Sequence, residues 1–228
     1  MPESKLFLGF LGFALFTAAF VAGCGTVGGQ PTEEGGQGSP GESSAASTGE
    51  RVKIGNTEAF VWGEGDYGVV MAHGASYDAA SWEKQGQRIA ENGIVALAPE
   101  DTSPESLLAS IEYLKEERGV RGVALMGGSA GGSTVLRAAK ENPGAANQLI
   151  ILSAAGDVSG LGTEPKLFVA SEGESRLAEE AHRMAQEAPG DRNEALILSG
   201  DAHAQAIFQA EEGDRLMRAI LERLEKYR

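Results

Sequence analysis

The sequence has one cysteine, three histidines and far fewer basic than acidic side chains. A single cysteine excludes an intramolecular disulfide and a cysteine-cluster zinc site. None of the histidines has the H-x₃-H or H-E-x-x-H spacing of a metal site, so we expect no metal. The 19 basic and 33 acidic residues give a net charge of −14, which argues against nucleic acid or anionic headgroups as main partners.

The longest uncharged apolar run lies at the start of the chain, over residues 6–23. It leads into Val21-Ala22-Gly23-Cys24. These residues resemble the bacterial lipobox, in which the chain is cut before a cysteine that is then acylated. The resemblance implies a signal peptide over 1–23, a lipid on Cys24 and a domain tethered to the membrane at the cell envelope. The alternative is an uncleaved anchor, because 18 apolar residues are close to the shortest membrane span.

The next segment is poor in apolar residues. Residues 25–50 include eight glycines and four serines. Such a composition buries too little apolar surface to offset the conformational entropy of the chain. We therefore expect a flexible linker over 24–50, with the lipidated cysteine at its start, and one folded domain over 51–228.

From residue 67 onwards, short apolar runs alternate with helical patterns. The candidate strands are residues 67–72, 93–98, 120–126, 148–153, 167–171 and 195–199. Between the second and third runs, Ser103 and Pro104 predict a helix start and Gly119 predicts its end. Continuous apolar strands separated by helices predict an α/β fold, with a mostly parallel sheet covered on both faces. A site is then expected at the carboxyl ends of the strands.

The strongest motif follows the third candidate strand. Gly127-Gly128-Ser129-Ala130-Gly131 matches G-x-S-x-G between a strand and a helix. Ser129 must take a positive φ angle in this tight turn, and Gly127 and Gly131 supply the bare neighbours that the turn needs. A P-loop would need lysine where Ser133 stands, and a dinucleotide motif would need glycine at the serine itself.

A second motif, His73-Gly74-Ala75, follows the first candidate strand. Together with the serine motif it resembles the α/β-hydrolase superfamily. The resemblance implies a three-layer fold and a nucleophile at Ser129. It also implies that the backbone N–H groups of Ala75 and Ala130 form an oxyanion hole, and that His73 shapes the turn and is not the base.

The base of such an enzyme is expected late in the chain, after the last strand. His203 follows the candidate strand 195–199 and fits this place. His182 lies in a helical stretch among charged residues, where we expect it at the surface. The sequence therefore favours His203 as the general base.

The acid that orients this histidine is less well determined. In the superfamily it stands about three residues past the preceding strand, which favours Glu174. Glu172 and Asp157 remain alternatives, and Asp201 is expected to shape the turn before His203. The chain order of serine, acid and histidine is the one this superfamily uses.

These residues imply a serine esterase that cleaves esters, thioesters or lactones through an acyl-enzyme on Ser129. No metal or organic cofactor is implied. Only about 12 residues separate the strand ending at Ser153 from the one starting near Lys166, so we expect no inserted cap domain. This resembles the compact dienelactone-hydrolase-like and small esterase branches. The dienelactone enzymes use cysteine as nucleophile, so only their architecture is carried over.

Two other functions remain open. One is a catalytically silent binding lipoprotein on the same fold, because fold does not determine function. The other is an acyltransferase that passes the acyl group to an alcohol instead of water. In each case we expect a monomer that binds a small acyl substrate, binds no nucleic acid and contacts the membrane through Cys24.

Overall fold

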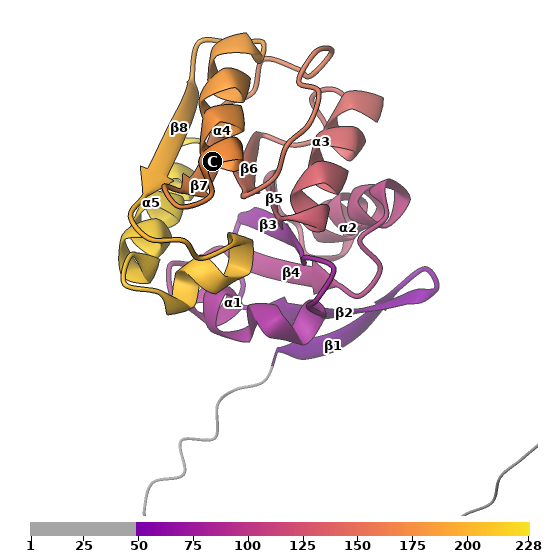
Figure 1. The fold of residues 1–228 in the computed structure, drawn as a ribbon. Coiled ribbons are helices and arrows are strands. Elements are labelled where there is room, and N and C mark those ends of the chain that lie inside the picture. Colours follow the sequence, from indigo (N-terminus) through magenta and orange to yellow (C-terminus); the bar gives the residue numbers. More distant parts are fainter. Residues whose placement is uncertain (1–48) are drawn as a thin grey trace, which may run out of the picture. The chain divides into compact units, whose positions relative to one another are not determined.

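The computed structural model describes residues 49–228, so the predicted signal peptide at 1–23, Cys24 and the predicted linker up to residue 48 lie outside the described residues. Within this described range, eight strands form one sheet in the order β1-β2-β4-β3-β5-β6-β7-β8 (Figure 1). The strands are β1 (Glu50–Ile54), β2 (Thr57–Trp62), β3 (Tyr67–Ala72), β4 (Val95–Pro99), β5 (Gly122–Gly128), β6 (Gln148–Leu152), β7 (Lys166–Ser171) and β8 (Asn193–Leu198). β2 pairs antiparallel with β1 and β4, and the other neighbours are parallel. The predicted mostly parallel sheet is confirmed.

Helices cover both faces of this sheet. They are α1 (Glu83–Ala90), α2 (Pro104–Glu117), α3 (Ala130–Glu141), α4 (Ser175–Glu187) and α5 (Gly213–Lys226), with short 3₁₀ helices η1 (Ala79–Trp82) and η2 (Ala204–Gln209). Apolar residues of α2, α3 and α4 form one core with the sheet, and those of α1 and α5 form a second core (Figure 1). Successive residues of β3 alternate between them, since Val70 faces the first core and Val69 the second. The predicted three-layer α/β arrangement is therefore confirmed.

The helix signals of the sequence are confirmed at α2. Ser103 is its N-cap and accepts a hydrogen bond from the backbone N–H of Ser106 at 3.3 Å. Pro104 is the first helical residue, and Gly119 just past the end has a φ angle of +70°. Local side-chain chemistry therefore determined both ends of this helix.

The hairpin of β1 and β2 was not predicted. Most of β1 is exposed, and its charged residues interrupt the apolar pattern that marks the buried strands. An edge strand buries only one side, so its sequence can be largely polar and still pair with its neighbour. The hairpin extends the sheet beyond β4, on the side away from β5.

The segment that joins β6 to β7, residues 153–165, contains neither helix nor strand. In the described part of the chain, no helix is long and apolar enough to cross a membrane.

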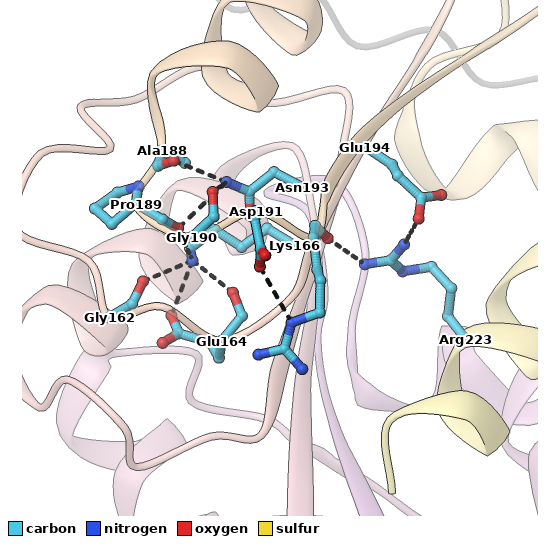
Figure 2. Close-up of polar contacts among 11 residues, drawn as sticks. Gly162, Glu164, Lys166, Ala188, Pro189, Gly190, Asp191, Asn193, Glu194 and Arg223 are labelled. Carbon is cyan, nitrogen blue, oxygen red and sulfur yellow. Dashed lines mark hydrogen bonds and ion pairs between the residues drawn. The ribbon is translucent and has the colours of Figure 1, made fainter.

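A buried lysine holds this segment at the amino end of β7. The Lys166 side chain is fully buried, and its Nζ donates hydrogen bonds to the backbone carbonyls of Gly162, Glu164 and Pro189 at 2.7, 2.6 and 3.0 Å (Figure 2). The Glu164 carboxylate lies 3.6 Å from the same nitrogen. Burial lowers the pKa of Lys166. The ammonium group thus ties the β6–β7 segment to the turn before β8.

We expect Lys166→Met to lower the free energy of unfolding by about 3 kcal/mol or more, because methionine leaves buried carbonyls without a donor. Urea denaturation followed by circular dichroism measures this loss. Lys140→Met is the matched control, since the ion pair of Lys140 with Asp157 lies at the surface and should contribute much less. Equal losses in the two variants would contradict a structural role for the buried ammonium group.

Candidate active site

Ser129 lies in the tight turn between β5 and α3. Its φ and ψ angles are +53° and −118°, a conformation that costs energy for a residue other than glycine. A Cβ added at Gly127 would lie 2.5 Å from the carbonyl oxygen of Gly131, and one added at Gly131 would lie 2.3 Å from that of Ala72. The predicted positive φ angle and the need for two bare neighbours are both confirmed.

The structure brings Ser129, His203 and Glu174 together, and we refer to these three residues as the triad. His203 Nε2 lies 2.8 Å from Ser129 Oγ, and His203 Nδ1 lies 2.5 Å from Glu174 Oε1. A carboxylate can only accept hydrogen bonds, so the neutral imidazole carries its proton on Nδ1. Its Nε2 then accepts the hydroxyl proton of Ser129. This is the arrangement that a general base needs to activate a serine nucleophile.

The second oxygen of the Glu174 carboxylate is also occupied. Oε2 accepts hydrogen bonds from Ser153 Oγ at 2.6 Å and from the Ser171 N–H at 3.2 Å. Ser153 Oγ in turn accepts from the Ala204 N–H at 2.9 Å, next to His203. The Glu174 side chain is 11% exposed, so these donors determine how its carboxylate is oriented. Ser153 and Ser171 were not predicted as part of the site, because their only signal in the sequence is a place at a strand end.

The other acidic candidates do not contact the histidine. Glu172 is exposed, and its backbone N–H pairs with β8. Asp157 is exposed and forms an ion pair with Lys140 at 2.5 Å. The hydrogen bond from Lys140 holds the pKa of Asp157 well below its usual range. Glu174, the favoured residue, is therefore the acid that the structure places against His203.

The remaining histidines lie outside the triad. His73 Nδ1 is 3.0 Å from the Gly74 carbonyl oxygen, and its Nε2 is 3.1 Å from the Glu100 carbonyl oxygen just after β4, so both ring nitrogens face backbone carbonyls away from Ser129. His182 is exposed on α4, and Asp201 is exposed in the loop before η2. Among residues 49–228 no group of three or more histidine, cysteine or acidic side chains could hold a metal ion.

The segment 73–77, which we call the His-Gly turn, lies directly against the serine turn. A Cβ at Gly74 would be 3.4 Å from Ser129 Cβ. Ala130 begins α3, so its N–H belongs to the positive end of the helix dipole. Within the described part of the chain, the N–H groups of Ala75 and Ala130 donate no hydrogen bond to the protein. These two donors therefore remain available for a negative oxygen that forms next to Ser129.

The six parallel strands of the sheet, β3 to β8, explain why these residues meet. Ser129 follows β5, Glu174 follows β7, His203 follows β8 and the His-Gly turn follows β3. The carboxyl ends of parallel strands lie at the same edge of a sheet. Moreover, β3 and β5 are neighbours on the two sides of the point where the strand order reverses, which is where such sheets form a crevice.

No protein-family model matches the chain, and no curated protein matches it. Solved structures do match. A monoacylglycerol lipase of Paleococcus ferrophilus has 17% identity and a TM-score of 0.62 over 76% of this chain and 100% of its own. An esterase of Pyrobaculum calidifontis has 16% identity and a TM-score of 0.64 over 78% and 85%. A proline iminopeptidase of Mycobacterium smegmatis has 11% identity and a TM-score of 0.60 over 78% and 98%. At such low sequence identities the matches show a shared fold only. The described part of this chain has the α/β-hydrolase fold.

Proposed function

We propose that this protein is a serine hydrolase that cleaves carboxylic esters through an acyl-enzyme on Ser129. The observation that carries the proposal is the hydrogen-bonded series from Ser129 Oγ through the His203 ring to Glu174, at 2.8 and 2.5 Å. The strained conformation of Ser129 adds to it, because strain of this kind is found mostly at functional sites.

In the first step, Ser129 Oγ attacks the ester carbonyl carbon while His203 Nε2 takes the hydroxyl proton. The carbonyl oxygen becomes negative and accepts hydrogen bonds from the N–H groups of Ala75 and Ala130. Losing one such donor typically lowers the rate by about 100- to 1,000-fold. The intermediate collapses as His203 gives its proton to the leaving alcohol, and the acyl group stays on Ser129.

In the second step, His203 takes a proton from water, whose oxygen attacks the acyl carbon. The bond from the acyl group to Ser129 Oγ then breaks, the acid leaves, and His203 returns the proton to Oγ. Two features favour water over a second alcohol as the acceptor. The His203 side chain is 49% exposed, and the segment between β6 and β7 carries no helix over the strand ends. Such an open site suits small acyl substrates, and the same chemistry cleaves thioesters and lactones. We further propose that a lipid on Cys24 tethers the domain to the cell envelope.

Hydrolysis of p-nitrophenyl esters of increasing acyl length, together with labelling by a fluorophosphonate, tests the enzymatic proposal. We expect turnover of short-chain esters and labelling that Ser129→Ala abolishes. A folded protein that neither hydrolyses the esters nor reacts with the fluorophosphonate would contradict a serine hydrolase. Labelling without ester turnover would contradict ester hydrolysis and favour amide cleavage or acyl transfer.

The proposed lipid tether is tested separately. Cys24→Ser should move the protein from the membrane fraction to the soluble fraction, and an unchanged distribution would exclude a lipid at this cysteine.

A further inference from the structure

A buried glutamine in η2, just after His203, contacts the His-Gly turn. Gln205, two residues beyond His203, is 4% exposed. Its Oε1 accepts a hydrogen bond from the Gly74 N–H at 2.7 Å, and its Nε2 donates to Ser81 Oγ at 2.8 Å. The partners are 131 and 124 residues away in the sequence. One side chain thus joins η2 to both ends of the segment that contains Ala75.

The segment between these two contacts has its own hydrogen bonds. The Tyr77 N–H donates to the Gly74 carbonyl at 3.0 Å, which closes a turn around Ala75. Ser81 Oγ donates to the Asp78 carbonyl at 2.5 Å. Gln205 therefore holds a segment that is already compact, and it determines where that segment lies relative to the rest of the site.

Gln205 also packs close to the nucleophile. A Cβ added at Gly128, the residue before Ser129, would lie 3.4 Å from Gln205 Cγ. A Cβ at Gly74 would lie 3.4 Å from Ser129 Cβ and 3.6 Å from Gln205 Oε1. The two hydrogen bonds of the Gln205 side chain determine where Gly74 and Ser81 lie relative to η2. That geometry includes the N–H of Ala75, one residue after Gly74.

We propose that Gln205 is a positioning residue that places the oxyanion donor Ala75 relative to Ser129. The inference rests on the proposed ester hydrolysis. Without the Oε1 acceptor, the Gly74 N–H has no partner and the His-Gly turn can shift away from the developing oxyanion. The hydrogen bonds of the triad do not involve Gln205, so proton transfer by His203 stays intact. The loss therefore falls on kcat, and KM and the pH dependence of the rate stay close to those of the wild type.

The test compares Gln205→Met with Gln205→Glu. Methionine keeps the volume but loses the acceptor, so kcat should fall by about 10- to 100-fold, a part of what full loss of an oxyanion donor costs. Glutamate keeps an oxygen toward Gly74 and should keep the Gly74 amide protected. Its buried negative charge near the oxyanion lowers kcat by itself, so this variant is compared through the amide and not through the rate. Gln209→Met, at the exposed end of η2, is the matched control and should retain activity.

Two further readouts separate positioning from a general loss of structure. The affinity for a trifluoromethyl ketone, whose adduct carries an oxyanion, should fall in parallel with kcat in Gln205→Met. Hydrogen exchange at the Gly74 amide, followed by NMR, should be slow in the wild type and Gln205→Glu and faster in Gln205→Met. The hydrogen-exchange measurement does not depend on enzyme activity. If the wild-type protein were inactive, the proposed function would be contradicted, whereas exchange at the Gly74 amide would still show whether Gln205 holds the turn.

Three outcomes would overturn the role of Gln205. The first is a wild-type kcat in Gln205→Met. The second is equal protection of the Gly74 amide with and without the glutamine. The third is a loss of activity that only follows the unfolded fraction measured by thermal denaturation.

Discussion

We expect His203→Ala to lower kcat for a short-chain p-nitrophenyl ester by about 10⁴- to 10⁶-fold. Ser129 Oγ then loses the base at 2.8 Å that takes its proton, and a neutral hydroxyl is a poor nucleophile. The His203 side chain is 49% exposed, so its removal leaves no cavity in the core and the melting temperature should hardly change. Steady-state kinetics and thermal denaturation of the same preparation measure both effects.

A double variant that combines Ser129→Ala with His203→Ala tests whether the two residues act together. Residues that act as a unit are not additive, so the double variant should be no slower than Ser129→Ala alone. His182→Ala is the matched control, because this histidine is exposed on α4 outside the triad, and it should leave kcat unchanged. A loss in kcat of less than tenfold in His203→Ala, or losses in kcat that add fully in the double variant, would exclude Ser129 and His203 acting together as nucleophile and base.

Glu174→Gln should lower kcat by about 10³- to 10⁴-fold, an effect expected when the histidine is held in the wrong tautomer. The Ser171 N–H can only donate, so it holds the amide oxygen of the glutamine on the side where Oε2 stands. The NH₂ group then faces His203 Nδ1 and donates to it. The imidazole must carry its proton on Nε2, where it can no longer accept the proton of Ser129.

Glu172→Gln and Asp157→Asn are the matched controls for this acid. Glu172 is exposed and Asp157 pairs with Lys140, so each should keep kcat within about 3-fold of the wild type, as for other surface changes. Steady-state kinetics of the three variants at one pH separates them. If either control lost as much activity as Glu174→Gln, the assignment of the acid from the structure would be wrong.

Much of the sheet could be predicted from the sequence because the buried parallel strands are continuous apolar runs. The edge hairpin of β1 and β2 could not, since strands that bury one side carry a mixed pattern. The conformation at Ser129 was predictable for a local reason, because G-x-S-x-G between a strand and a helix needs bare neighbours and a positive φ angle. The lipid on Cys24 and the monomeric state stay predictions, as do the catalytic roles of the triad and of the Ala75 and Ala130 amides.

The acid of the triad could not be identified from the sequence alone. Counting past β7 favoured Glu174 but left Glu172 and Asp157 open, because spacing does not say which way a side chain faces. The structure separates them through a turn in which the Glu174 N–H donates to the Ser171 carbonyl at 3.0 Å. This turn leaves Glu174 half-buried at the histidine and Glu172 exposed.

The sequence by itself therefore determined the buried parallel strands, the helix that joins two of them and the residues at their ends, since capping, turn chemistry and apolar runs act over a few neighbouring positions. Only the tertiary structure decided which groups support them. Ser153 meets Glu174 and Ala204 across 21 and 51 residues, and Gln205 meets Gly74 across 131. Such contacts leave no local pattern, because they exist only once the parallel sheet has placed its carboxyl ends along one edge.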